Sequence, residues 1–120
     1  MTLNLYAVTI DCSDAAGLAA FWSGVLDRSV DEGATEEFAS IGLHDPADSR
    51  PHWMFVKVPE GKETKNRLHP DLVTPDLDGD VSRLVARGAV RGGQFEESGA
   101  RWVTLADPEG NEFDVVAESA

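Results

Sequence analysis

The chain has 120 residues, of which 42% are hydrophobic and 27% charged, a composition typical of one compact globular domain. Ten basic residues against 22 acidic ones give a formal net charge of −12, which argues against nucleic acid and anionic membrane surfaces as partners because both attract Lys and Arg. A single cysteine, Cys12, excludes an internal disulfide, and no stretch approaches the ~18 apolar residues of a membrane span, so we predict a cytoplasmic protein.

The first half of the chain predicts one strand, one helix and two further strands. The segment "YAVTIDC", residues 6–12, is rich in β-branched and apolar residues, as strands are. Ser13 and Asp14 offer a helix start, and the following apolar residues share one helix face. Two strands are then expected in "EEFASIGL", residues 36–43, and "HWMFVKV", residues 52–58.

The second half repeats this order at a constant offset of 62 residues. Asp76 matches Asp14 and Gly79 matches Gly17. Thr74 offers an N-cap, followed by Pro75 at the first helical position. Strands are predicted in "ARWVTLA", residues 100–106, and "NEFDVVA", residues 111–117, joined by the turn "DPEG".

These elements predict an α+β fold of two βαβββ modules with mixed sheets that curve around a shared cavity. Module one covers about residues 1–58, a polar linker covers 59–66, and module two covers about 67–120. Each module alone has too little core to stand, so we expect a single domain.

The segments "YAVTIDCSDAAGLAAFW", "VPEGKETKNRLHPDL" and "WVTLADPEGNEFDVV" resemble the vicinal oxygen chelate superfamily. Its members include glyoxalase I, fosfomycin resistance enzymes, extradiol dioxygenases and bleomycin resistance proteins, and the nearest group is the glyoxalase-like domain. In metal-dependent members the ligands come from the first and last strands of each module. By position, these four places fall at Ala7, near Phe55, at His69 and at Asp114.

The resemblance therefore predicts an incomplete metal site. Ala7 and Phe55 cannot donate to a metal, which leaves His69 and Asp114, whereas catalytic zinc normally has three protein ligands. We predict no cofactor; the alternative is a divalent metal (Zn, Fe, Mn or Ni). Three acids share strand faces with these places and could complete a set: Asp11, Asp71 and Glu112. His44 and His52 are expected at the surface, with His52 as a reserve ligand.

We expect the cavity lining to combine aromatic walls with titratable groups. Such a lining suits a flat, positively charged guest through stacking and cation–π contact. Trp102 could be a further wall or part of the core. The residues predicted to face the cavity are Thr9, Asp11, Trp53, Phe55, His69, Asp71, Glu112 and Asp114.

Three functions fit these observations. The first is a small-molecule-binding protein without a full metal site, which holds a cationic or aromatic ligand between the modules. The second is a metal-dependent lyase, isomerase or dioxygenase, with Glu112 or His69 as the candidate catalytic group. The third is an interaction module whose cavity is vestigial. The resemblance also implies a homodimer.

Overall fold

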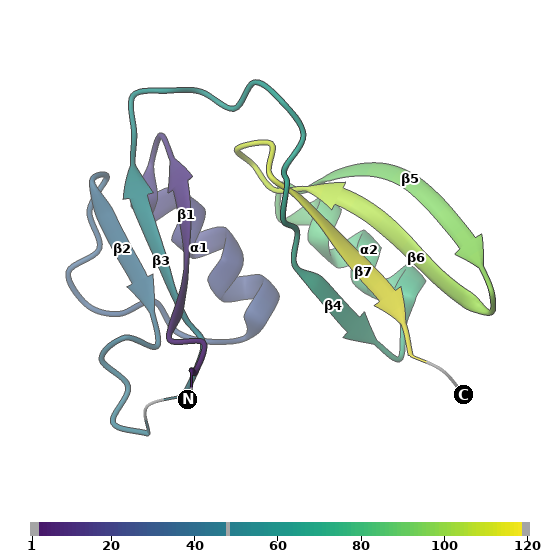
Figure 1. Cartoon of the computed structure of the whole chain (residues 1–120), viewed down its shortest axis with the longest axis horizontal. Coiled ribbons are helices and arrows are strands. Elements are labelled where there is room, and N and C mark those ends of the chain that lie inside the picture. The colour runs from purple at the N-terminus through teal and green to yellow at the C-terminus, as the bar shows by residue number, and fades with distance from the viewer. Residues whose placement is uncertain (1–2, 48, 119–120) are drawn as a thin grey trace. The chain divides into compact units, whose positions relative to one another are not determined.

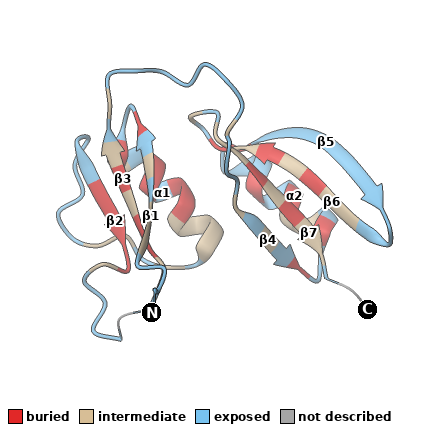
Figure 2. Ribbon diagram, in the orientation of Figure 1, coloured by how far each residue is buried: buried red, intermediate tan, exposed pale blue. Residues whose placement is uncertain are grey.

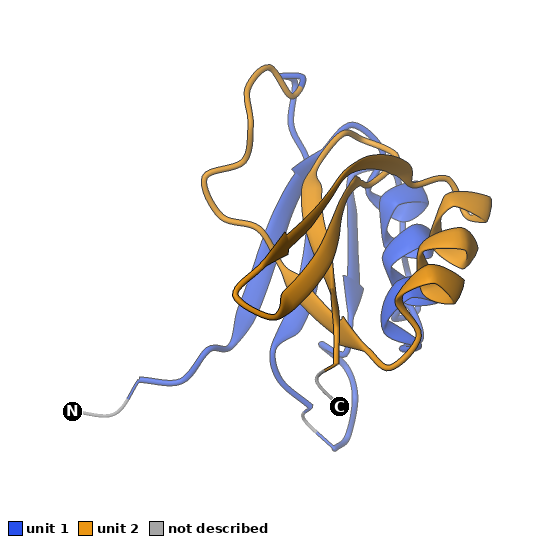
Figure 3. Ribbon diagram, turned by 90° about the vertical axis from the view of Figure 1, so that its right-hand side faces the viewer, with its two compact units in different colours: residues 1–61 blue, residues 62–120 orange. Residues whose placement is uncertain are grey.

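A computed structural model describes residues 3–47 and 49–118 of the chain. The chain divides into two compact units, Met1–Gly61 and Lys62–Ala120, coloured separately in Figure 3. In each unit one helix covers one face of a β-sheet (Figure 1).

Unit 1 is built on a three-stranded mixed sheet. Its central strand, β3, runs parallel to β1 and antiparallel to β2 (Figure 1). A single bridge between Val30 and Ile41 stands where a further strand would follow the helix. The elements are β1 (Ala7–Cys12), α1 (Ala15–Leu26), β2 (Phe38–Ile41) and β3 (His52–Lys57).

The core of unit 1 lies between α1 and the sheet. Asp14 caps α1 by accepting a hydrogen bond from the Gly17 amide at 3.3 Å. The buried face of the helix then meets β3, where Trp22 stacks on Trp53 with 5.2 Å between ring centroids and an interplanar angle of 22°. Phe55, two residues along β3, is completely buried on the same face.

Unit 2 contains the complete βαβββ order. Its four-stranded sheet has the order β4-β7-β6-β5, with β4 parallel to β7 and the other neighbours antiparallel (Figure 1). Leucine and valine side chains of α2 pack on one face of this sheet. The elements are β4 (Asp71–Thr74), α2 (Leu77–Ala86), β5 (Val90–Glu97), β6 (Ala100–Ala106) and β7 (Glu112–Ala117).

The start of α2 differs from the prediction. The N-cap is Asp76, whose carboxylate accepts from the Gly79 amide at 3.1 Å, and the helix begins at Leu77. Thr74 is instead the buried last residue of β4, where its hydroxyl accepts from the Asp76 amide at 2.9 Å and donates to Asp80. The prediction that Thr74 caps the helix was therefore wrong by two residues, because both side chains are good caps.

No residues were assigned to strand β5 from the sequence, although the predicted βαβββ order requires a strand after the second helix. Gly92 and Gly93 interrupt its pattern, and the register with β6 shifts between Arg91 and Gln94. A Cβ at Gly92 would lie 2.9 Å from the Thr104 carbonyl oxygen, so the close approach of β6 requires glycine there. Figure 2 shows β5 exposed along its whole length, which is typical of an edge strand.

The fold class is therefore confirmed as α+β, with two mixed sheets that are each βαβββ-like. No helix within residues 3–47 and 49–118 is long and apolar enough to cross a membrane.

Candidate functional site

The sheet of unit 2 has one face covered by α2 and one open face. Val103, Leu105 and Val115 are buried under the helix, so the residues that alternate with them point to the open face. Strand register arranges these open-face residues in two neighbouring rows. One row is polar and contains Asp71, Asp114 and Thr104; the other is mainly apolar and contains Val73, Val116, Trp102 and Phe95.

The polar row forms a hydrogen-bonded cluster with His69. The imidazole Nδ1 lies 2.9 Å from Asp71 Oδ1 and 3.6 Å from Asp114 Oδ2. The Thr104 hydroxyl donates to the second oxygen of Asp114 at 2.6 Å. A hydrogen bond from Nδ1 to the Asp71 carboxylate requires the tautomer with the hydrogen on Nδ1, because a carboxylate can only accept. Sequence reasoning missed Thr104, although its place in the strand "RWVTLA" was predicted.

His69 lies before β4 and not within a strand as predicted. The strand begins at Asp71, after Pro70, which has no amide hydrogen to donate. The first strand-like contact is made by the Pro70 carbonyl, which accepts from the Asp114 amide at 3.0 Å. His69 and Asp114 therefore meet within unit 2, on neighbouring segments.

The apolar row carries an aromatic platform. Phe95 and Trp102 stack with 5.6 Å between centroids and an interplanar angle of 23°. Trp102 is half-buried and lies on the open face, and Phe95 is 46% exposed. A Cβ at Gly93 would lie 2.8 Å from the Phe95 ring, so the ring folds over this glycine. Phe95 was missed because no residues were assigned to its strand.

Glu112 shares the open face by alternation but is engaged elsewhere. Its Oε1 lies 2.7 Å from Lys62 Nζ, and its Oε2 accepts from the Asn66 amide at 3.2 Å. The hydrogen bond from the Lys62 ammonium is the main cause that lowers the pKa of Glu112 below its usual value, against the opposing effect of burial. The group is thus held as a carboxylate in an ion pair, which disfavours it as a proton shuttle.

The face of the unit 1 sheet that points away from α1 carries different residues at the equivalent places, and one of them, Ser40, is buried with its hydroxyl donating to Asp31. The offset of 62 residues relates Thr9 to Asp71, and register relates Met54 to Asp114 and Ser40 to Thr104. Asp11 also lies on this face and is exposed.

The prediction that Trp53 and Phe55 line an open concave face was wrong. Both are buried under α1, since the parallel register places Met54 beside Thr9. The place assigned near Phe55 therefore falls on Met54. His52, expected at the surface, is also buried, with Tyr6 edge-on to its ring at 4.8 Å.

A divalent metal is the cofactor that the resemblance implies, and the polar row fits it in part. His69, Asp71 and Asp114 each offer a ligand atom, and these atoms lie within 4.8 Å of one another. One nitrogen and two carboxylate oxygens match the number of protein ligands in a catalytic zinc site. At the equivalent places of unit 1, however, Ala7 offers no donor and Met54 offers only a soft thioether.

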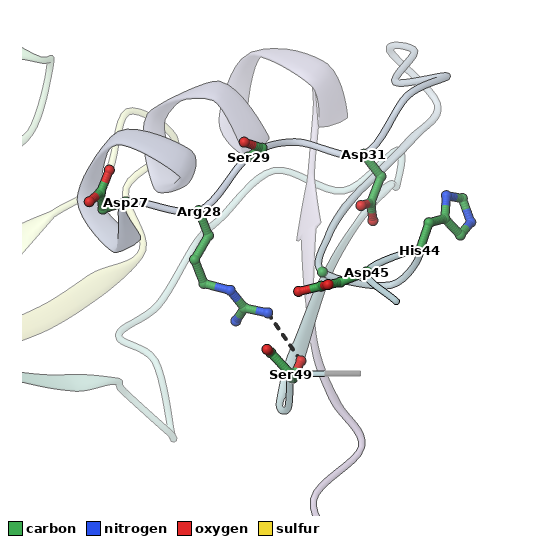
Figure 4. A pocket seen from close by; sticks show the side chains of 8 residues that line it. Asp27, Arg28, Ser29, Asp31, His44, Asp45 and Ser49 are labelled. Carbon is green, nitrogen blue, oxygen red and sulfur yellow. Dashed lines mark hydrogen bonds between the residues drawn. The ribbon is translucent and has the colours of Figure 1, made fainter. Parts of the chain in front are cut away.

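Unit 1 also contains a hollow of about 690 Å³ that the sequence did not suggest (Figure 4). Its charged groups serve the loop before β3: the Arg28 guanidinium donates to the carbonyls of Ser49 and Pro51 at 3.1 and 3.0 Å, and Asp31 accepts from Ser40 and Leu43. The sequence does not predict that these residues lie together, because they come from two separate loops. The hollow is lined by Asp27, Arg28, Ser29, Asp31, Gly42, His44, Asp45 and Ser49.

Comparison with solved structures shows the same fold. A glyoxalase/bleomycin resistance protein/dioxygenase family enzyme from Burkholderia phytofirmans PsJN is 19% identical, with a TM-score of 0.75 and coverage of 96% of this chain and 98% of that one. A superfamily member from Sphaerobacter thermophilus DSM 20745 is 20% identical, with a TM-score of 0.67 and 98% of each chain covered. The genomically encoded fosfomycin resistance protein FosX from Listeria monocytogenes is 14% identical, with a TM-score of 0.76 and coverage of 99% and 96%.

No curated protein matches the sequence. The family model described as "Glyoxalase-like domain" matches residues 7–116, a range that covers most of both units and the whole polar row. The chain therefore belongs to the glyoxalase-like domain family.

Proposed function

We propose that this protein binds a small, flat, positively charged molecule on the open face of unit 2, without a full metal site. The observation that carries this proposal is the two neighbouring rows on that face. A row with two carboxylates runs beside a row with two stacked aromatic rings. Small-molecule sites commonly combine an apolar surface with a few polar anchors.

The strand register supports contact of one molecule with both rows. Trp102 is paired with Val116 and Thr104 with Asp114, so Trp102 and Asp114 are diagonal neighbours on the sheet. Such neighbours lie ~7–8 Å apart, about the length of a bicyclic ring. A flat ring over the aromatic platform would then bring its cationic group close to Asp114.

The charges on the face favour a cation. Asp71 and Asp114 add two negative charges, whereas His69 adds one positive charge at most. Thr104 fixes one oxygen of Asp114, which leaves the carboxylate orientation set before a ligand arrives. The stacked rings add cation–π attraction of about 0.5–2 kcal/mol.

Isothermal titration with three probes tests this proposal. N-methylquinolinium is a flat cation, tetramethylammonium is a cation without a flat body, and naphthalene-2-sulfonate is a flat anion. We expect measurable binding of the first, weaker binding of the second and none of the third. Asp114→Asn keeps an acceptor for Thr104 but removes the charge, and should weaken N-methylquinolinium binding at least tenfold, since a charged contact contributes about 1.5–3 kcal/mol.

The control for this titration is Glu118→Gln, which removes an exposed acid just after β7, away from the polar row. Equal affinity for the cation and the anion would contradict the proposal, as would an unchanged affinity in Asp114→Asn.

The clustering of three ligand atoms favours a second candidate, a metal-dependent lyase, isomerase or dioxygenase. His69, Asp71 and Asp114 would hold the ion, which would act as a Lewis acid on adjacent oxygens of the substrate. Metal analysis of untagged protein, followed by melting with Zn²⁺, Mn²⁺, Fe²⁺ and Ni²⁺, separates the two candidates. Stoichiometric metal that is lost in His69→Ala would favour the enzyme; failure of both metal and probes would favour an interaction module.

We also infer that the two units form one glyoxalase-like domain and that the protein is a homodimer. The family match through both units supports the first inference, and the resemblance alone supports the second. Light scattering coupled to size exclusion tests the second, because the chain mass of 12.9 kDa separates a monomer from a dimer clearly.

A further inference from the structure

We infer that Glu112 is a positioning residue that holds the His69 imidazole in place through the linker between the units. Glu112 does not contact the imidazole. It acts instead on Asn66 and Lys62, which precede His69 in the chain.

Glu112 makes three contacts that fasten the linker to the start of β7. Its carboxylate accepts from the Asn66 amide at 3.2 Å and pairs with Lys62 Nζ at 2.7 Å. Its main-chain carbonyl accepts from Asn66 Nδ2 at 2.9 Å. The side chains of Lys62 and Glu112 are only 22% and 20% exposed, so this ion pair is shielded more than a surface pair.

A second attachment to the same strand lies just beyond the histidine. The Pro70 carbonyl accepts from the Asp114 amide at 3.0 Å. Residues 67–69 therefore span two fixed points on β7, one at Glu112 and one at Asp114. A span this short leaves the backbone of His69 little freedom, and loss of either point would release it.

The position of this backbone sets where the imidazole lies relative to the acids. With the span held, Nδ1 points to Asp71 and Asp114, and Nε2 remains as the nitrogen that can meet a ligand. With Asn66 released, the ring would sample orientations in which neither carboxylate fixes the tautomer.

Nitrogen-15 NMR of the histidine rings at constant pH tests this inference without any ligand. Signals of His44, His52 and His69 are assigned with His69→Gln and His44→Gln. In the unmodified protein we expect His69 to show a protonated Nδ1 fixed by the acids. In Glu112→Ala and in Asn66→Ala we expect the two nitrogen shifts of His69 to move toward each other. In Glu112→Ala, which removes the acceptor of the residue-66 amide, protection of that amide against hydrogen exchange should fall at least tenfold.

Glu112→Gln should lie between these states, because it retains an acceptor for Asn66 but loses the ion pair. Glu63→Gln is the matched control, an acid in the same linker that is exposed, and it should leave the His69 signals unchanged. His69 signals unaltered in both alanine variants would overturn the inference, and if one alanine variant fails to fold the other still decides.

The effect on ligand affinity rests on the proposed function and is measured separately. We expect N-methylquinolinium to bind Glu112→Ala about three- to tenfold more weakly. Absence of binding to the unmodified protein would refute the proposed function but leave the NMR result intact, so the two failures are distinguishable.

Discussion

The open faces of the two sheets place different chemistry at equivalent register positions. In unit 1 the places are held by Thr9, Met54 and Ser40; in unit 2 they are held by Asp71, Asp114 and Thr104. The helix-covered faces, in contrast, are alike: each packs apolar side chains under one capped helix. Both units thus have the same kind of apolar core under a helix, whereas only unit 2 has the pair of acids Asp71 and Asp114.

The largest effect, a loss of stability, is expected when a buried side chain between a helix and its sheet is removed. Trp22 is 1% exposed and stacked on Trp53, so Trp22→Ala removes a large buried side chain and leaves a cavity. We expect the free energy of unfolding to fall by about 3–5 kcal/mol, measured by urea denaturation. A loss below about 1 kcal/mol would mean that α1 does not pack as described.

The next largest effect is expected when Asp114 of unit 2 is replaced by methionine, the residue at the equivalent place of unit 1. Asp114→Met should weaken N-methylquinolinium binding at least tenfold, because the carboxylate of the polar row is lost. Stability should change by only about 1 kcal/mol, since Asp114 is not in the buried core. Met54→Leu on the equivalent place of unit 1 is the control, and calorimetry should show its affinity unchanged. Equal losses in both variants would erase the distinction between the two faces.

A smaller effect is expected from the apolar row. Trp102→Leu keeps an apolar side chain but removes the ring that stacks on Phe95. Affinity for N-methylquinolinium should fall about two- to thirtyfold, the range that cation–π contacts of about 0.5–2 kcal/mol provide. Phe38→Leu is the matched aromatic control on the open face of unit 1. If Phe38→Leu had the larger effect, the platform would be assigned to the wrong sheet.

The smallest effect concerns the start of α2, where the two helices differ. The Thr74 hydroxyl, followed by Arg83, lowers the pKa of Asp80 below its usual value. A lowered pKa stabilises the fold above the unfolded-state value of about 4, and this stability is lost as the pH falls through the folded-state value. Because Asp80 is 38% exposed, we expect Asp80→Asn to cost only about 0.5 kcal/mol at pH 7.

Thermal melts of Asp80→Asn and the unmodified protein should therefore converge as the pH is lowered below about 4. A difference that grows toward acid would show that the carboxylate does not stabilise the folded state.

Sequence periodicity predicted most of the framework because strands and helices with one buried face leave a regular pattern. It failed for β5, because Gly92 and Gly93 interrupt the apolar pattern of this strand. Both glycines lie at the register shift, and Gly93 also leaves room for the Phe95 ring. It also failed for the phase of β3, because "HWMFVKV" is apolar on both faces. A shift of one residue then moved Trp53 and Phe55 from the core to the open face.

The sequence predicted only those residues of the candidate site whose positions could be counted from a repeated feature, such as a helix start or a turn. His69, Asp71 and Asp114 followed from position relative to the helix starts and the turn, and the structure brings them together. Thr104 and Phe95 could not be found this way, because strand register and a strand to which no residues were assigned bring them to the site. The hydrogen bond between Glu112 and Asn66 joins residues that are 46 positions apart in the sequence, so no local pattern predicts it.

The most direct test is an NMR titration of the unmodified protein with N-methylquinolinium, followed by its amide signals. The account predicts that the largest shifts fall on Asp71, Trp102 and Asp114, with saturation at a single affinity. Saturable shifts centred on Thr9 and Met54 alone, or no saturable shifts at millimolar probe, would contradict it.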